Sequence, residues 1–162
     1  MKFLRELYLE GCSKFEKFPD TFTYMGHLRG LHLRGSGIKE LPSSIGYLES
    51  LEILDLSCCS KFEKFPEIQG NMKCLLNLFL DETAIKELPN SIGSLTSLEM
   101  LSLEECSKFE NFSDVFTNMG RLRELRLYGS GIKELPSSIG YLESLKNLNL
   151  SYCSNFEKFP EI

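Results

Sequence analysis

Leucines recur along the chain in the pattern L-x-x-L-x-L, with variable and often polar residues between them. The pattern occurs seven times, and its first leucines are Leu4, Leu28, Leu51, Leu75, Leu98, Leu122 and Leu145. The second half of each segment alternates apolar and variable residues, which predicts a short β-strand with one buried face. The gaps between first leucines alternate between 24 and 23 residues, so the full unit is a pair of repeats 47 residues long.

A fixed period of this length is typical of a leucine-rich-repeat solenoid. We therefore predict an α/β fold, a right-handed solenoid forming a curved horseshoe segment. Seven short parallel strands would line its concave face, and short helical or 3-10 turns and loops its convex face. Residues 1–162 are predicted to form one array rather than two domains. Neither end shows a polar end repeat, so we expect an uncapped fragment of a larger protein, with exposed end leucines and end-to-end self-association.

Two repeat types alternate along the chain. The longer type carries CSKFEKFP or a close variant, at residues 12–19, 59–66, 106–113 and 153–160. The shorter type carries IKELPSSIGYL or a close variant, at residues 38–48, 85–95 and 132–142. Residues 35–51 and 129–145 are identical at all 17 positions, which indicates tandem duplication.

Proline marks the start of most return segments, because it fixes φ and donates no backbone hydrogen bond. The residues after it in the shorter repeats predict a helical or 3-10 turn capped by Ser43 or Ser137. Ser113 stands where the sister repeats have proline, and we expect a looser return segment there.

The apolar residues of the return segments are predicted to fill the core. In the longer repeats these are phenylalanines, namely Phe15, Phe18, Phe62, Phe65, Phe109, Phe112, Phe156 and Phe159. In the shorter repeats they are isoleucines and leucines, such as Ile38, Leu41, Ile45 and Leu48.

Four of the six cysteines fall at one position of every second repeat, namely Cys12, Cys59, Cys106 and Cys153. Two strand spacings of about 4.8 Å separate neighbours, which is too far for a disulfide or a shared zinc ion. The intervening repeats carry Ser36, Thr83 and Ser130 at that position, so we predict a buried ladder of small side chains. Reduced thiols then indicate a cytoplasmic or nuclear compartment.

Composition and motifs exclude several classes of function. The net charge of −5 argues against a nucleic-acid partner, and no apolar run approaches the roughly 20 residues of a membrane span. No phosphate-binding loop, nucleophile elbow or zinc-protease motif occurs, so we predict no catalytic residues, no cofactor and no enzymatic activity. His32 is predicted to make a polar contact rather than to bind a metal.

The residues between the leucines would point outward and form the exposed concave face. Acidic residues dominate its third to fifth repeats, while basic residues stand in the second and sixth, and this zoned charge with exposed aromatic residues is typical of a protein-binding surface. The candidate binding residues are Tyr8, Glu10, His32, Arg34, Asp55, Phe79, Asp81, Met100, Glu104, Arg126 and Tyr128.

A simpler interpretation treats the charges as ordinary surface pairs between neighbouring strands. The predicted pairs are Glu10 with Arg34, His32 with Asp55, Arg29 with Glu52, and Glu99 with Arg123.

The alternation of L-x-x-L-x-L-x-x-C-S and FEKFP with IKELPSSIGYLESL resembles the repeat region of plant intracellular immune receptors. These receptors also carry a Toll/interleukin-1-receptor domain and a nucleotide-binding domain. The resemblance implies that the repeats sense a pathogen effector, directly or through a guarded host protein. It also implies contacts with the receptor's own nucleotide-binding domain that hold the receptor inactive.

Two alternatives stay open. A plant intracellular scaffold could use the same repeats without a nucleotide switch. An enzyme such as a repeat-bearing ubiquitin ligase would need an appended catalytic domain, which these 162 residues do not contain.

Overall fold

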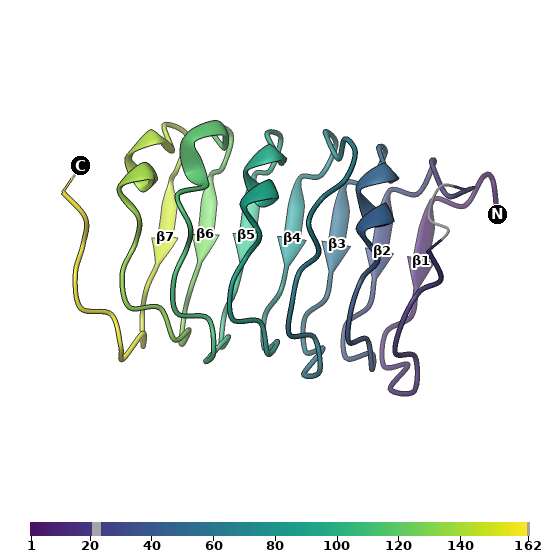
Figure 1. Ribbon diagram of the computed structural model, residues 1–162, viewed down its shortest axis with the longest axis horizontal. Coiled ribbons are helices and arrows are strands. Elements are labelled where there is room, and N and C mark those ends of the chain that lie inside the picture. The colour runs from purple at the N-terminus through teal and green to yellow at the C-terminus, as the bar shows by residue number, and fades with distance from the viewer. Residues whose placement is uncertain (21–23, 162) are drawn as a thin grey trace.

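The computed structural model describes residues 1–20 and 24–161 of the chain. One parallel sheet runs through it, with the strands in chain order. The strands are β1 (Glu6–Tyr8), β2 (Gly30–His32), β3 (Ile53–Asp55), β4 (Asn77–Phe79), β5 (Met100–Ser102), β6 (Glu124–Arg126) and β7 (Asn147–Asn149). Figure 1 shows them side by side along the long axis of the molecule, with the return segments on the opposite side. This arrangement confirms the predicted leucine-rich-repeat solenoid with seven parallel strands.

The register of the sheet follows from the leucine pattern. The central leucine of each strand pairs with that of the next, as Leu31 does with Leu54, and Leu54 with Leu78. These three leucines are fully buried. Because side chains alternate along a strand, the residues on either side of the central leucine point away from the core.

Short 3-10 helices cover the side of the solenoid opposite the sheet (Figure 1). They are η2 (Ser43–Tyr47), η3 (Asn90–Ser94), η4 (Phe116–Asn118) and η5 (Ser137–Tyr141). The prediction that Ser43 and Ser137 cap these turns is wrong, because both serines already lie inside the helix. Pro42 and Pro136 hold the N-cap positions in an extended conformation, and neither helix has a side-chain cap.

The return segment that follows Ser113 contains a 3-10 helix, η4, at residues 116–118. The expected looseness of this segment stays a prediction. Val115, Phe116 and Met119 are buried in the core. Burial of these apolar side chains helps to hold the segment against the core.

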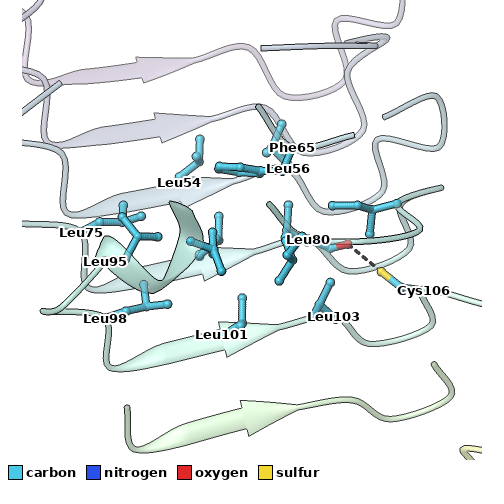
Figure 2. Close-up of a cluster of buried hydrophobic side chains, with 14 of the residues drawn as sticks. Leu54, Leu56, Phe65, Leu75, Leu80, Leu95, Leu98, Leu101, Leu103 and Cys106 are labelled. Atoms are coloured by element: carbon cyan, nitrogen blue, oxygen red, sulfur yellow. Dashed lines mark hydrogen bonds between the residues drawn. The ribbon is translucent and has the colours of Figure 1, made fainter. Parts of the chain in front are cut away.

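The core is continuous through the middle repeats and thins at both ends. Phe62, Phe65 and Phe109 are fully buried, as predicted, and Figure 2 shows Phe65 among the strand leucines. Phe15 and Phe156 are only partly buried. Phe159 is 49% exposed, so its assignment to the core is wrong. It lies in the last described return segment, where no further repeat packs over it.

The predicted ladder of small side chains forms inside the solenoid. Cys59, Cys106 and Cys153 are buried, together with Ser36, Thr83 and Ser130. Every cysteine in the chain is free. Cys12 departs from the prediction because it is exposed at the first repeat, where no preceding strand covers it.

Candidate protein-binding face

The sheet places two rows of outward-pointing residues on one surface. We call this surface the sheet face, and we include in it the residue two positions after each strand. The first row is Glu6, Gly30, Ile53, Asn77, Met100, Glu124 and Asn147. The second row is Tyr8, His32, Asp55, Phe79, Ser102, Arg126 and Asn149. The sheet therefore brings the candidate residues of the first six repeats onto one surface.

The candidate residues differ in exposure. Tyr8, Glu10 and Arg34 are exposed. The others are half-buried, namely His32, Asp55, Phe79, Asp81, Met100, Glu104, Arg126 and Tyr128. A half-buried side chain is held by its neighbours yet keeps a surface for a partner, which reduces the entropy lost on binding.

Three apolar side chains lie among polar ones in the middle of the sheet face. Ile53, Phe79 and Met100 are all half-buried and come from the adjacent strands β3, β4 and β5. The register places Phe79 beside Asp55, and Met100 beside Asn77. Aromatic and methionine side chains of this kind are enriched at the centres of protein interfaces.

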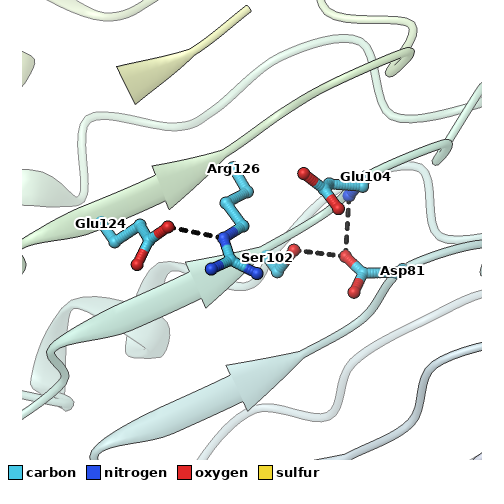
Figure 3. Close-up of polar contacts among 5 residues, drawn as sticks. All are labelled: Asp81, Ser102, Glu104, Glu124 and Arg126. Carbon is cyan, nitrogen blue, oxygen red and sulfur yellow. Dashed lines mark hydrogen bonds and ion pairs between the residues drawn. The ribbon is translucent and has the colours of Figure 1, made fainter. Parts of the chain in front are cut away.

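Two carboxylates, Asp81 after β4 and Glu104 after β5, lie close together on the sheet face (Figure 3). One oxygen of Asp81 accepts hydrogen bonds from the Ser102 hydroxyl and from the backbone N–H of Glu104, the latter at 2.8 Å. Burial raises the pKa of Glu104, and the nearby negative charge of Asp81 raises it further. The two carboxylates therefore concentrate negative charge at a fixed place on the face.

Arg126 lies close to this acidic pair but binds elsewhere. Its Nε donates a 2.7 Å hydrogen bond to Glu124, two residues earlier on β6 (Figure 3). That bond raises the pKa of Arg126, burial opposes the rise, and the negative charges of Glu124, Glu104 and Asp81 add to it. Among the described residues, Asp81 and Glu104 form no direct ion pair, and the nearby Arg126 binds Glu124 instead.

Aromatic pairs stand at both ends of the sheet face. Tyr8 stacks on His32 with ring centroids 4.5 Å apart, and Tyr128 contacts Tyr152 at 5.0 Å. Tyr152 is 80% exposed and was not among the sequence candidates. Tyr152 lies in the turn after β7, and its contact with Tyr128 places its ring beside the sheet face.

The predicted surface pairs are partly confirmed. Arg29 pairs with Glu52 at 3.6 Å, and Arg123 pairs with Glu99 at 3.4 Å. Among the described residues, no ion pair joins Glu10 and Arg34, so that prediction is wrong.

His32 also departs from its predicted pairing with Asp55. Its Nε2 lies 3.2 Å from Glu6 Oε2 instead. Gly30 permits this contact, because the Glu6 carboxylate occupies the space that a Cβ at residue 30 would fill. Sequence analysis missed this contact because the sequence does not show that the Glu6 carboxylate fills the space beside Gly30.

Comparisons with known proteins agree with this architecture. Residues 1–130 match a family described as "Leucine-rich repeat region". A segment of 57 residues is 47% identical to a candidate disease resistance protein of Arabidopsis thaliana, and it covers 35% of this chain and 7% of that protein. The chain therefore spans only a small part of this relative. Among the described residues, no helix has the length and apolar character needed to cross a bilayer.

Solved structures share the fold over almost the whole chain. The leucine-rich-repeat domain of the type III effector XopL has a TM-score of 0.78 and 25% identity, and the match covers 98% of this chain and 64% of that one. The plant peptide hormone receptor RGFR1 has a TM-score of 0.71 and 23% identity, with 98% and 28% covered. Listeria monocytogenes InlP has a TM-score of 0.71 and 22% identity, with 91% and 45% covered. Because the family match extends over most of the chain and the fold agrees with it, this protein belongs to the leucine-rich-repeat family.

Proposed function

We propose that this chain is a non-catalytic protein-recognition and autoinhibition module of a plant intracellular immune receptor. One observation carries the proposal: the frame of the repeats is copied while the sheet face is varied. Residues 35–51 and 129–145 are identical, yet the strands before them differ at every outward position. Gly30, His32 and Arg34 on the second repeat correspond to Glu124, Arg126 and Tyr128 on the sixth. Identical frames need no such difference for folding, so the variation favours a role in recognition.

The chemistry of the sheet face supports a protein as the partner. Its middle combines Ile53, Phe79 and Met100 with the carboxylates of Asp81 and Glu104. In protein interfaces, apolar and aromatic side chains supply most of the affinity, and charge sets orientation and association rate. We propose that the partner is a pathogen effector or a host protein that the receptor guards.

Two observations support membership in an immune receptor. The 57-residue segment matches a candidate disease resistance protein at 47% identity. The alternating repeat sequences also resemble those of receptors that carry a Toll/interleukin-1-receptor domain, and this finer assignment rests on that resemblance alone. A cytoplasmic or nuclear location is proposed on the same basis, together with the free thiols of all six cysteines.

Autoinhibition would operate by a shift between two states. In one state the sheet face docks on the receptor's nucleotide-binding domain, and in the other it is released. A ligand that binds the released state more tightly shifts the population toward it and frees the switch domain. A scaffold without a nucleotide switch would lack the docked state.

The test is a pull-down of the chain with the nucleotide-binding domain that the proposal requires in the same gene. Phe79→Ala and Met100→Ala should each weaken capture by several-fold, because they remove apolar side chains from the middle of the face. Tyr47→Ala on η2 is the matched control, since Tyr47 is 46% exposed on the opposite side. Unchanged capture by both face variants, with weaker capture by the control, would overturn the proposal. A gene without a nucleotide-binding domain would favour the scaffold.

A further inference from the structure

Three metal-binding side chains converge near the N-terminal end of the sheet face. Each of Glu10, His32 and Asp55 offers one ligand atom that lies within 4.8 Å of the ligand atoms of the other two. The register explains the convergence: His32 pairs with Asp55 on β3 and with Tyr8 on β1, and Glu10 lies two residues beyond Tyr8. The three residues lie 22 and 23 positions apart in sequence, which is why no short metal-binding motif reveals them.

Neighbouring residues hold two of these side chains in place. The Tyr8 ring stacks on the His32 imidazole with an interplanar angle of 8°. Glu6 Oε2 lies 3.2 Å from His32 Nε2. Asp55 Oδ1 accepts a 2.9 Å hydrogen bond from the backbone N–H of Ser57, which leaves the second carboxylate oxygen free. A histidine whose one nitrogen contacts a carboxylate and whose other nitrogen remains open is a common feature of metal sites.

We propose that Glu10, His32 and Asp55 bind a divalent transition metal ion of the Zn²⁺ class, with Glu6 as the positioning residue for the imidazole. Binding through His32 Nδ1 would leave Nε2–H to donate to Glu6. One imidazole and two carboxylates match the ligands that Zn²⁺ takes, and the two carboxylates balance its charge. The ion would retain a fourth position for water.

The spacing of the three residues is compatible with this ion after a small movement. Zinc bonds of about 2.0–2.2 Å to nitrogen and oxygen place tetrahedral ligand atoms roughly 3.3–3.5 Å apart. The present separations are at most 4.8 Å. Glu10 is exposed and its side chain has three rotatable bonds, so it can shorten its own distances to the other two ligands without moving the backbone.

The ligand set also distinguishes between cations. Ca²⁺ and Mg²⁺ prefer oxygen ligands and larger coordination numbers, which one imidazole and two carboxylates do not supply. Imidazole suits the later first-row transition metals. The site should therefore bind Zn²⁺ and exclude Ca²⁺ and Mg²⁺ at comparable concentrations.

The experiment titrates the full 162-residue chain with Zn²⁺ by isothermal calorimetry, and it follows both imidazoles by long-range ¹⁵N–¹H NMR. The chain has only two histidines, so His32 and His27 can be separated. We expect one saturable Zn²⁺ per chain and a shift of the His32 ring nitrogens alone. His32→Gln and Asp55→Asn should each weaken binding at least tenfold, and Asp55→Asn keeps an oxygen that can accept the Ser57 hydrogen bond.

Two controls separate this site from other zinc ligands. His27→Gln removes the other histidine, whose ring stacks on Phe3 at 6.3 Å, and it should leave binding unchanged. Cys58→Ser removes a half-exposed thiol three residues after Asp55 and should also leave zinc binding unchanged. The proposal is overturned by the absence of saturable Zn²⁺ binding, by equal binding in His32→Gln, or by loss of binding in Cys58→Ser.

Discussion

The Cys106 thiol donates a hydrogen bond to the carbonyl oxygen of Leu80, 3.0 Å away in the preceding repeat (Figure 2). Cys59 bonds Leu33 in the same way at 3.1 Å, and Cys153 bonds Leu127 at 2.9 Å. The hydroxyl of Thr83 lies 3.4 Å from the Cys106 sulfur and donates to the Leu80 carbonyl at 2.7 Å. The ladder therefore satisfies buried carbonyl groups at the boundary between repeats.

Cys106→Ala should destabilise the chain by about 1–3 kcal/mol, because it removes a hydrogen bond to a buried carbonyl and leaves a small cavity. Cys106→Ser should cost less, since its hydroxyl can still donate to Leu80. Urea unfolding followed by circular dichroism measures both changes. Cys12→Ala is the matched control at the exposed end of the same ladder, and its effect should be close to zero. Equal losses at positions 12 and 106 would disprove the role of the ladder.

Alkaline pH should destabilise the chain through the same residue. Burial raises the pKa of Cys106 to about 11. Thiols of the unfolded chain ionise near pH 8.5. The unfolded state therefore loses its proton first, and the stabilising effect of the protonated thiol is present below about pH 8.5 and is lost as the pH rises toward 11.

The measurement is the free energy of unfolding at several values between pH 8 and pH 11, compared with Cys106→Ser. The wild-type chain should lose on the order of 2–3 kcal/mol more than the variant across this range. Parallel pH curves for the two chains would show that Cys106 does not titrate in this way.

The turn after each strand requires a left-handed backbone conformation. The third residue after each strand has a positive φ of 55–67° in all seven repeats, namely Gly11, Gly35, Cys58, Glu82, Glu105, Gly129 and Tyr152. A side chain in this region costs about 1–2 kcal/mol. Glycine avoids that cost but loses more conformational entropy on folding, so its net gain is smaller. Glu105→Gly should therefore stabilise the chain by about 0.5–1 kcal/mol.

Gly35→Ala provides the reverse test at the equivalent turn. The nearest atom to an added Cβ is 3.9 Å away, so the substitution changes conformation without a clash. It should destabilise the chain by about 1 kcal/mol in thermal or urea unfolding. A destabilised Glu105→Gly would instead indicate that its side chain contributes more than the backbone costs.

The fold was predictable because the leucine spacing fixes both the strand register and the direction of the core. Leu31, Leu54 and Leu78 pair and are buried as their positions predict. The ends were less predictable, because burial there depends on neighbouring repeats rather than on the sequence of the repeat itself. Phe159 and Phe65 illustrate this: they occupy equivalent positions in the repeat, yet only Phe65 is buried.

The sheet face was predictable in membership but not in its contacts. Strand alternation identifies which side chains point outward, whereas their partners depend on side-chain length and on gaps in the surface. His32 contacts Glu6 because Gly30 leaves the space open, and Arg126 folds back onto Glu124 in its own strand. Neither contact has a signal in the repeat pattern.

The central claim is that the copied frame folds the chain while the varied sheet face recognises the partner. Its most direct test transfers the face of the second repeat to the sixth by Glu124→Gly, Arg126→His and Tyr128→Arg. Affinity for the proposed partner, a nucleotide-binding domain of the same receptor, is measured by surface plasmon resonance. Tyr141→Ala on η5, 63% exposed, is the control.

The transferred chain should keep the circular dichroism spectrum and cooperative unfolding of the wild type. The reason is that the sequence of residues 129–145 occurs unchanged at residues 35–51, where it already follows this set of face residues. Its Kd should rise at least tenfold, about 1.4 kcal/mol, while Tyr141→Ala binds like the wild type. Wild-type affinity in the transferred chain, with its fold intact, would contradict the account.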